Sequence, residues 1–155
     1  MALVVDANTV VAACLAAGDG FAEFDDQELI APDLMWWEAA STLHEYLWLI
    51  EADRRTTDMV DLEREDVLAG LNRLRQAPVQ AVPVNVDVVD EAWHVADRCG
   101  FAKVYDAAYV AVARLKGATL VTLDRRLCAS PAAKLVPIVG PADVVSHGMA
   151  PVSDP

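Results

Sequence analysis

The sequence predicts a three-layer α/β/α domain in which helices cover both faces of a mostly parallel central sheet. Short apolar runs alternate with longer segments of helical periodicity, and this alternation is typical of parallel strands joined by helices. The chain has 155 residues, which fits one domain with its own core. Because no internal repeat and no linker interrupt the pattern, we expect a single domain over residues 1–145 and a C-terminal tail over 146–155.

The first part of the chain predicts two strands, each followed by a helix. Residues 2–5 form a short apolar run, which indicates a buried strand, and the Ala-, Val- and Leu-rich residues 7–17 indicate a helix that ends at a Gly-Asp-Gly breaker. A brief strand over 29–31 precedes a long helix over 33–52, for which Asp33 is the expected N-cap. The apolar stripe of this helix comprises Met35, Ala39, Leu43, Tyr46, Leu47 and Ile50.

The middle of the chain predicts a broken helical region, an edge strand and a further helix. Residues 56–76 are charged and helical in pattern, with a break or bend near 63–66. The strand over 79–84 contains Pro83, which cannot donate a backbone hydrogen bond and therefore favours the edge of the sheet. A helix over 87–99 follows, with a glycine as its C-terminal stop.

The last part alternates helix and strand twice. Residues 106–116 form an almost wholly apolar helix, which indicates burial, and 118–123 form a clear strand. A short helix over 124–128 and a strand over 135–139 precede a Pro-rich tail. In parallel sheets of this kind the functional groups lie just beyond the carboxyl ends of the strands, so candidate site residues are expected there.

The charge balance excludes proteins that bind nucleic acid or membranes through a broadly basic surface. The chain has 12 Lys and Arg against 24 Asp and Glu, which gives a net charge of −12. If the protein meets RNA, it must do so through metal ions and a local basic patch.

The sequence favours a cytoplasmic protein with no membrane association. It has no apolar run of about 18 residues that could span a bilayer, and residues 1–5 lack the basic residues of a secretory signal. Cys14, Cys99 and Cys128 lie far apart and form no Cys-x-x-Cys pair. This usage suits small buried thiols in a reducing compartment.

Four carboxylates stand out among the 24 acidic residues because of their neighbours. Asp6 and Asp124 each follow an apolar run, at the carboxyl end of a predicted strand, although either could simply cap the next helix. Asp106 opens the apolar helix, where it also complements the helix dipole. Glu38 lies between aromatic and small residues beside an apolar stripe, where a carboxylate is desolvated and costly unless it has a cation.

A cluster of these acids would repel itself unless a positive ion lay among them. Mg²⁺ or Mn²⁺ fits, because each takes oxygen ligands and prefers one or two carboxylates with several waters. Zinc is disfavoured, since His44, His94 and His147 are scattered and are expected at packing or surface positions. The sequence has no Walker A loop and no Ser-His-Asp arrangement, so metal-assisted hydrolysis of a phosphodiester is the reaction class that fits.

Four short segments combine an apolar run with an acidic residue. They are residues 3–8 (LVVDAN), 31–38 (APDLMWWE), 105–111 (YDAAYVA) and 117–127 (GATLVTLDRRL). Each is unspecific alone. In this order and at this spacing, the chain resembles the PIN-domain family, and within it the VapC-type toxins of bacterial toxin–antitoxin pairs, over nearly its whole length.

The resemblance implies a PIN-like fold and a Mg²⁺- or Mn²⁺-dependent endoribonuclease with an acidic quartet of Asp6, Glu38, Asp106 and Asp124. Asp6 and Asp106 match the family's most dependable metal ligands, and Asp124 would complete the metal site directly or through water. Glu38 would hold a water or a second metal ion, or act as the base. Asn8 stands where the family often has Ser or Asn, and would hydrogen-bond a ligand carboxylate.

The resemblance also implies partners. Family members commonly form homodimers, cut structured RNAs such as tRNA and rRNA, and are silenced by a cognate VapB-type antitoxin whose C-terminal segment covers the active-site groove. Arg125 and Arg126 could supply a local RNA-binding patch, as could Arg54 with Arg55, or Lys103. These arginines could instead be solvated surface residues. Trp36, Trp37 and Trp48 exceed what a small core needs and therefore favour a dimer, although they could also simply pack in the core.

The main alternative is a non-catalytic PIN-like scaffold that only binds a partner, because an intact quartet does not prove turnover. A phosphatase of the haloacid-dehalogenase type is disfavoured, since Asn8 replaces the second Asp of its Asp-x-Asp-x-Thr loop and an amide cannot act as the general acid. A phosphorelay receiver would need an acidic pair after the first strand and a Lys after a late strand, and the sequence offers neither.

Overall fold

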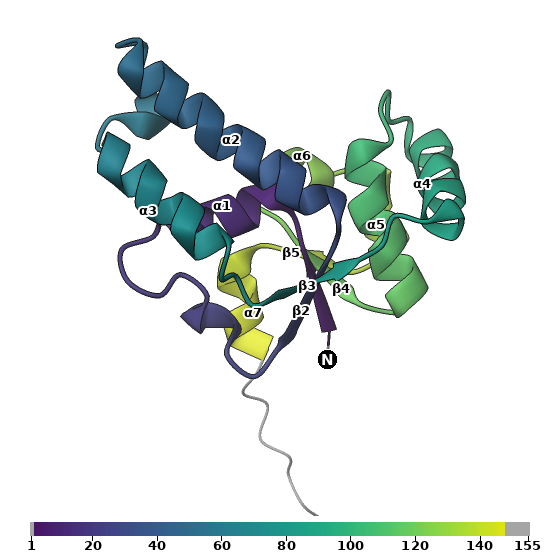
Figure 1. The fold of residues 1–155 in the computed structure, drawn as a ribbon. Coiled ribbons are helices and arrows are strands. Elements are labelled where there is room, and N and C mark those ends of the chain that lie inside the picture. The colour runs from purple at the N-terminus through teal and green to yellow at the C-terminus, as the bar shows by residue number, and fades with distance from the viewer. Residues whose placement is uncertain (1, 148–155) are drawn as a thin grey trace, which may run out of the picture.

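The computed structural model describes residues 2–147, with a sheet of five parallel strands at its centre (Figure 1). The strand order is β3-β2-β1-β4-β5, and every pairing is parallel. The strands are β1 (Ala2–Val5), β2 (Glu28–Pro32), β3 (Val79–Val82), β4 (Thr119–Val121) and β5 (Ile138–Val139). The predicted parallel character of the sheet is confirmed, and it extends to all of these strands.

Helices cover both faces of the sheet. They are α1 (Ala7–Leu15), α2 (Leu34–Glu51), α3 (Arg64–Leu74), α4 (Val86–Cys99), α5 (Tyr105–Lys116), α6 (Arg125–Cys128) and α7 (Pro141–His147). In Figure 1 the strands lie between α1, α2 and α3 on one side and α4 and α5 on the other. The first three helices pack against one another, α4 packs on α5, and α5 contacts β1, β2 and β4. The predicted three-layer α/β/α architecture is therefore confirmed.

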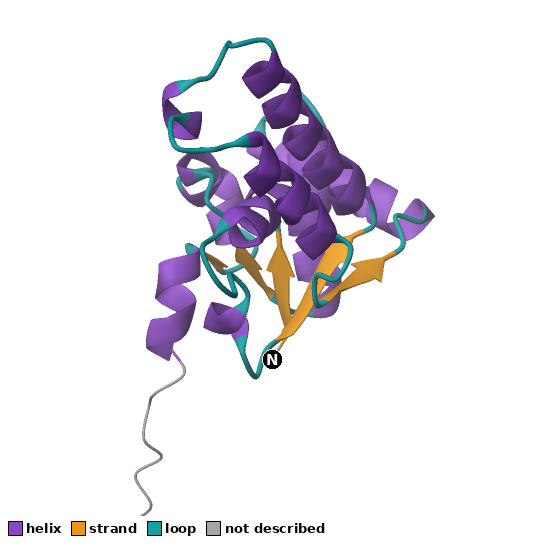
Figure 2. Ribbon diagram, turned by 60° about the vertical axis from the view of Figure 1, so that its left-hand side comes forward, coloured by secondary structure: helices purple, strands orange, loops and turns teal. Residues whose placement is uncertain are grey.

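The core lies around β1 and α5. Leu3, Val4 and Val5 of β1 are all buried, as expected for the central strand of a sheet covered on both faces, and the strands lie side by side in Figure 2. Residues 107–113 of α5 are also buried, as the apolar sequence predicted. Helices α4 and α5 end at Gly100 and Gly117, whose φ angles of 71° and 60° suit glycine because it has no Cβ.

Two predictions about helix starts need correction. Asp33 precedes α2 as predicted, but its side chain does not cap the helix; Oδ1 instead accepts a hydrogen bond from the Val84 backbone N–H at 3.3 Å. The predicted break in the helical region from residue 56 lies at 60–63 instead of 63–66, between a 3-10 turn at Thr57–Met59 and α3. Glu63 lies at the predicted break and precedes α3, and its backbone N–H donates to the Asp66 carboxylate at 2.9 Å.

The C-terminal part differs more from the prediction. Residues 135–137 precede β5 instead of belonging to it, because the Leu135 and Val136 N–H groups bond back to the Ala132 carbonyl, at the 3-10 helix Pro131–Lys134. After β5 the chain forms α7, which packs against the 3-10 helix Ala22–Phe24 and continues past residue 145. Residues 148–155 of the predicted tail lie outside the described residues, so the proposed division at 145 remains a prediction.

Cys14, Cys99, Cys128, His44 and His94 belong to no group of described side chains that could hold a metal ion. Cys14 is buried, and this burial raises the pKa of its thiol to about 11, while Cys99 and Cys128 are half-buried rather than fully buried as predicted. His44 and His94 are exposed, as predicted for surface positions. None of the helices described here is long and apolar enough to cross a bilayer.

Candidate active site

The predicted strand-end carboxylates lie where the topology of the sheet changes direction. Strand β1 has β2 on one side and β4 on the other, so the strand order reverses between β1 and β4. Asp6 follows β1 directly, and its backbone N–H donates to the Val121 carbonyl of β4 at 3.3 Å. Ligands of open parallel sheets bind at such a switch point, beyond the carboxyl ends of the strands.

A pocket of about 320 Å³ lies at this edge, and all four predicted carboxylates line it. Asp6 precedes α1, Glu38 belongs to α2, Asp106 lies in the first turn of α5, and Asp124 precedes α6. The remaining lining residues are Ala7, Asn8, Ser41, Thr42, Tyr109 and Leu127. Segments far apart in the sequence thus bring four acidic side chains around one cavity. Among the described residues, no histidine or cysteine lines it.

Asp6 is fixed by the protein through both of its carboxylate oxygens. Its Oδ1 accepts from the Thr9 backbone N–H at 2.8 Å, so it caps α1, and its Oδ2 accepts from the Thr122 hydroxyl. The Thr122 Oγ1 in turn accepts from the Asp124 backbone N–H at 2.9 Å. Thr122 therefore joins two of the acid-bearing segments, and the helix-capping and pocket roles of Asp6 coexist.

Glu38 is held by a tyrosine across the pocket. The Tyr109 hydroxyl donates a hydrogen bond to Glu38 Oε2 from α5, and the tyrosine is itself buried. Desolvation raises the pKa of Glu38, the hydrogen bond from Tyr109 partly opposes this rise, and the charges of Asp106 and Asp6 add to it. Burial, followed by the contact with Glu38, also raises the pKa of Tyr109, which keeps the hydroxyl protonated as a donor.

The pocket raises the pKa of Asp106 as well. Desolvation is the main cause, followed by the negative charges of Asp124 and Asp6, while Lys103 acts in the opposite direction. Asp106 lies exposed at the rim, whereas Asp6 is buried at the base. The mutual repulsion of these acids is a physical reason for the pocket to attract a cation.

Sequence reasoning missed the two hydroxyl groups that organise the acids, Thr122 and Tyr109. The available signal was a threonine directly after the apolar residues 120–121, and a tyrosine within the apolar run of residues 107–113. Neither signal identifies the partner, because the Thr122–Asp6 and Tyr109–Glu38 bonds join residues 116 and 71 positions apart.

The remaining predicted site residues lie at the margin of the pocket. Asn8 lines it but is exposed, and it is the Thr9 backbone N–H, one residue further on, that bonds to Asp6. Arg125 and Arg126 of α6 are exposed, and the backbone N–H of Arg126 donates to Asp124 Oδ1 at 2.8 Å. The predicted roles of Asn8, Arg125 and Arg126 therefore stay predictions.

The donor chemistry of the pocket fits a hard divalent cation. In the part of the chain that the structure describes, no three Asp, Glu, His or Cys side chains are grouped closely enough to hold a metal ion as they stand. Mg²⁺ does not require such a cage, since it keeps several waters and uses one or two carboxylates. The four carboxylates supply oxygen ligands, and the negative charges among them help to raise the pKa of Glu38 and of Asp106, so the pocket has the chemistry for that mode of binding.

Comparison with known proteins identifies the fold. The family model for the PIN domain matches residues 3–132. No curated protein matches the chain.

Solved structures of similar fold cover most of the chain at low sequence identity. VapBC2 from Rickettsia felis, bound to a promoter DNA fragment, matches with a TM-score of 0.55 at 12% identity, covering 90% of this chain and 98% of that one. A toxin–antitoxin complex from Klebsiella pneumoniae gives 0.54 at 13%, covering 90% and 97%. VapC20 of Mycobacterium tuberculosis, a toxin that cleaves the sarcin–ricin loop, gives 0.53 at 17%, covering 82% and 93%. At these identities the likeness is one of fold.

Proposed function

The chain belongs to the PIN domain family, and from this premise we propose that it is a metal-dependent endoribonuclease, the toxin of a VapBC-type toxin–antitoxin pair. The observation that carries the proposal is the convergence of Asp6, Glu38, Asp106 and Asp124 on one pocket at the switch point of the sheet. Toxins and toxin–antitoxin complexes among the structures of similar fold support the same class. We place its activity in the cytoplasm, where its free thiols would stay reduced.

Asp6, Asp106 and Asp124 are the proposed holders of Mg²⁺, or of Mn²⁺ in its place. The bound ion would activate water and offset negative charge on the phosphodiester. Thr9 and Thr122 fix the orientation of Asp6, so that its carboxylate needs little rearrangement when a ligand arrives. Asn8, exposed at the rim, would hydrogen-bond a carboxylate of this set or its water.

Glu38 is the proposed general base. Its raised pKa brings it closer to the range in which a carboxylate takes a proton efficiently from an attacking water. The Tyr109 hydroxyl holds one carboxylate oxygen, which leaves the other to face the reacting groups. Arg125 and Arg126 would contact phosphates next to the cleaved bond, where their charge compensates locally for an acidic protein.

Metal-dependent cleavage of total RNA by the purified protein tests the proposal. Discrete fragments are expected with Mg²⁺ or Mn²⁺, none with chelator, and a loss of at least about 100-fold for Asp6→Asn, which removes a ligand charge and leaves the shape. Asp61→Asn, an exposed substitution in the segment before α3, is the matched control and should cleave normally.

A growth test distinguishes a non-catalytic scaffold from a nuclease. Expression of the parent chain should arrest growth, and Asp6→Asn should not. If both forms leave RNA intact with either metal and are equally toxic or equally harmless, the nuclease proposal is wrong and a binding scaffold is favoured.

The proposed inhibitor is a cognate VapB-type antitoxin with a basic segment that enters the acidic pocket. Opposite charges across an interface increase the association rate and specificity, and the pocket offers four carboxylates. Replacing the Arg and Lys residues of that segment by neutral residues should therefore weaken pairing. Unchanged affinity would contradict this electrostatic account.

The proposed homodimer uses the exposed stripe of α4 instead of the whole tryptophan set predicted from sequence. Trp36 is half-buried and packs against the core, so it is not free for a partner. Val86, Val89 and Trp93 lie on one face of α4 at helical spacing and are all exposed. Light scattering should give the mass of two chains for the parent protein and one for Trp93→Arg.

A further inference from the structure

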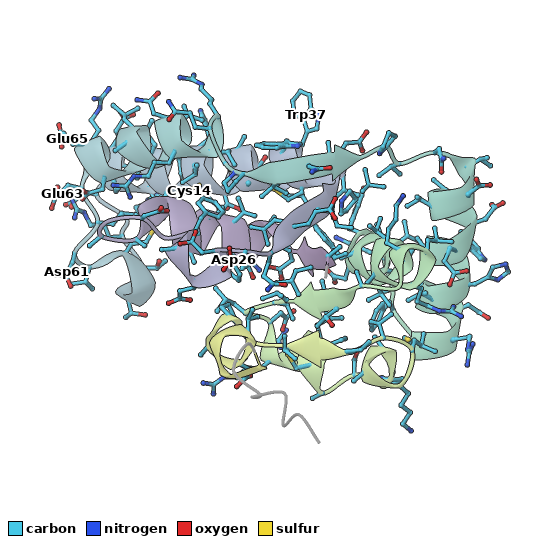
Figure 3. All side chains as sticks on the ribbon, turned by 90° about the horizontal axis from the view of Figure 1, so that it is seen from below. Cys14, Asp26, Trp37, Asp61, Glu63 and Glu65 are labelled. Carbon is cyan, nitrogen blue, oxygen red and sulfur yellow. The ribbon has the colours of Figure 1, made fainter. Side chains whose placement is uncertain are left out.

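Among the residues whose exposure the structure describes, Trp37 is the most exposed large hydrophobic side chain, with 82% of its surface accessible. Figure 3 shows its indole ring projecting away from the ribbon. The core face of α2 is formed by Met35, Ala39 and Leu43, so Trp37 does not serve the packing of its own helix. An exposed indole that borders an apolar hollow is a candidate for contact with another molecule.

The position of Trp37 ties this indole to the carboxylate pocket. Glu38, the next residue, lines that pocket. Ser41, one turn further along α2, lines both the carboxylate pocket and an apolar hollow of about 350 Å³ that Trp37 borders, between α2 and α3. The indole therefore borders a hollow that adjoins the carboxylate pocket at Ser41.

The charges around the pocket leave a polyanionic substrate with few attractive contacts. The net charge of −12 opposes its approach. The exposed cations associated with the pocket are Lys103, which lowers the pKa of Asp106, and Arg125 and Arg126 of α6. None of them belongs to α2, so on that helix any affinity for RNA must come from an interaction that needs no positive charge.

We infer that Trp37 is a stacking platform for a nucleobase adjacent to the phosphodiester held in the carboxylate pocket, an inference that rests on the proposed ribonuclease function. Every base has a flat π-face, so stacking on an aromatic side chain is tolerant of sequence and independent of net charge. One such contact changes affinity by about 5- to 150-fold. Trp37 thereby selects single-stranded RNA, or RNA with an unpaired base, at the cleavage site.

The test compares substitutions on one helix face in a common Asp6→Asn background, which blocks cleavage. Trp37→Ala removes the platform, Trp37→Phe keeps an aromatic ring, and Trp48→Ala is the matched control. Trp48 is also exposed, at 53%, and lies on the same face about 16 Å further along α2. Circular dichroism and the melting temperature should be unchanged for all three, because none of these side chains is buried.

Binding of short oligoadenylate is the readout. Trp37→Ala should weaken binding by about 5- to 150-fold, Trp37→Phe should restore most of it, and Trp48→Ala should leave it unchanged. An oligomer of abasic nucleotides should bind the parent and Trp37→Ala equally, which a structural role of Trp37 would not produce. With Asp6 intact, Trp37→Ala should raise KM for oligoadenylate cleavage more than it lowers kcat.

Three outcomes would overturn the inference. If the parent cleaves RNA but Trp37→Ala binds oligoadenylate as well as the parent does, the stacking role is wrong and the proposed function stands. If Trp37→Ala instead loses self-association or antitoxin binding with unchanged RNA affinity, the indole is a protein-docking residue. If the parent neither binds nor cleaves RNA with Mg²⁺ or Mn²⁺, the proposed function fails, and this inference fails with it.

Discussion

Glu38 is the residue at which the opposing demands of stability and chemistry are clearest. Desolvation and the neighbouring acids raise its pKa above the ordinary value of 4.5, and only the Tyr109 hydroxyl opposes them. At pH values between the pKa of Glu38 in the unfolded chain and its higher pKa in the folded protein, the folded protein binds more protons. The free energy of unfolding therefore falls as the pH rises through this range. At neutral pH the ionised Glu38 is therefore a net cost to folding.

Glu38→Gln is expected to stabilise the protein at neutral pH and to reduce cleavage. Glutamine keeps an oxygen to accept the Tyr109 hydrogen bond but removes the repelled charge, so a gain of about 0.5–2 kcal/mol is expected. The melting temperature should rise by about 2–4 °C per kcal/mol. Below pH 4.5, where the parent carboxyl is also protonated, the gain should disappear.

Thermal unfolding of the two proteins at neutral and acid pH measures this difference. Glu45→Gln is the control, because Glu45 is exposed on the same helix and does not line the pocket. A melting temperature that does not rise in Glu38→Gln, or that rises equally at both pH values, would show that Glu38 is not the repelled group described here.

At the residue scale the sequence predicted the acids but not their hydroxyl partners. Asp6 and Asp124 could be selected because each follows an apolar run, a property that is local in the chain. The contacts of Thr122 and Tyr109 depend on how β4 lies beside β1 and how α5 lies beside α2. Such contacts follow from tertiary packing, which local spacing does not encode.

At the scale of elements, predictions succeeded where one interaction decides the outcome. Gly100 ends α4 as predicted, and Gly117 ends α5 in the same way, because a left-handed residue is required there and glycine supplies it. Asp33 was predicted as a cap from its type and position, but the end of β3 lies close enough to compete for its carboxylate. Tertiary neighbours thus redirect a side chain without moving the start of α2.

Gly20 provides an element-scale test of how the segment after α1 is held. A Cβ built on Gly20 would lie 2.1 Å from the Ala13 carbonyl oxygen, so the segment packs directly on the backbone of α1. Gly20→Ala must move backbone, and a loss of about 3 kcal/mol in the free energy of unfolding is expected.

Denaturant unfolding measures this loss, with Gly18→Ala as the control. Gly18 has a φ of 91°, but a Cβ at this position would have no neighbouring atom within 4 Å, so its substitution should cost only about 1 kcal/mol of backbone strain. Equal losses at the two positions would mean that close packing on α1 is not what holds this segment.

At the scale of the whole molecule, the alternation of strands and helices was sufficient to predict the layers. It was also sufficient to place Asp6 and Asp124 near each other, because parallel strands end at a common edge. The addition of Glu38 and Asp106 to the same pocket required the packing of α2 and α5 against that edge. The resemblance to the PIN-domain family predicted that all four acids share one site, which the composition alone did not predict.

The charge of the whole molecule predicts an unusually weak dependence of RNA affinity on salt. Each phosphate neutralised on a single strand contributes about −0.7 to the slope of log affinity against log salt. With Lys103, Arg125 and Arg126 as the cations beside the pocket, the slope for oligoadenylate on Asp6→Asn should be no steeper than about −2. A protein that binds through a broad basic surface has a much steeper slope, because it releases many counterions.

Substitution of the two α6 arginines measures how much this local patch, as opposed to the rest of the surface, contributes to the salt dependence of RNA binding. The double variant Arg125→Gln, Arg126→Gln should flatten the slope by about 1.4, whereas Arg98→Gln, exposed on α4, should leave it unchanged. The affinity that remains in high salt should still depend on Trp37, because stacking releases no counterions. The opposite result is a steep slope that Arg98→Gln flattens as much as the α6 substitutions do. That result would mean that RNA binds outside the carboxylate pocket.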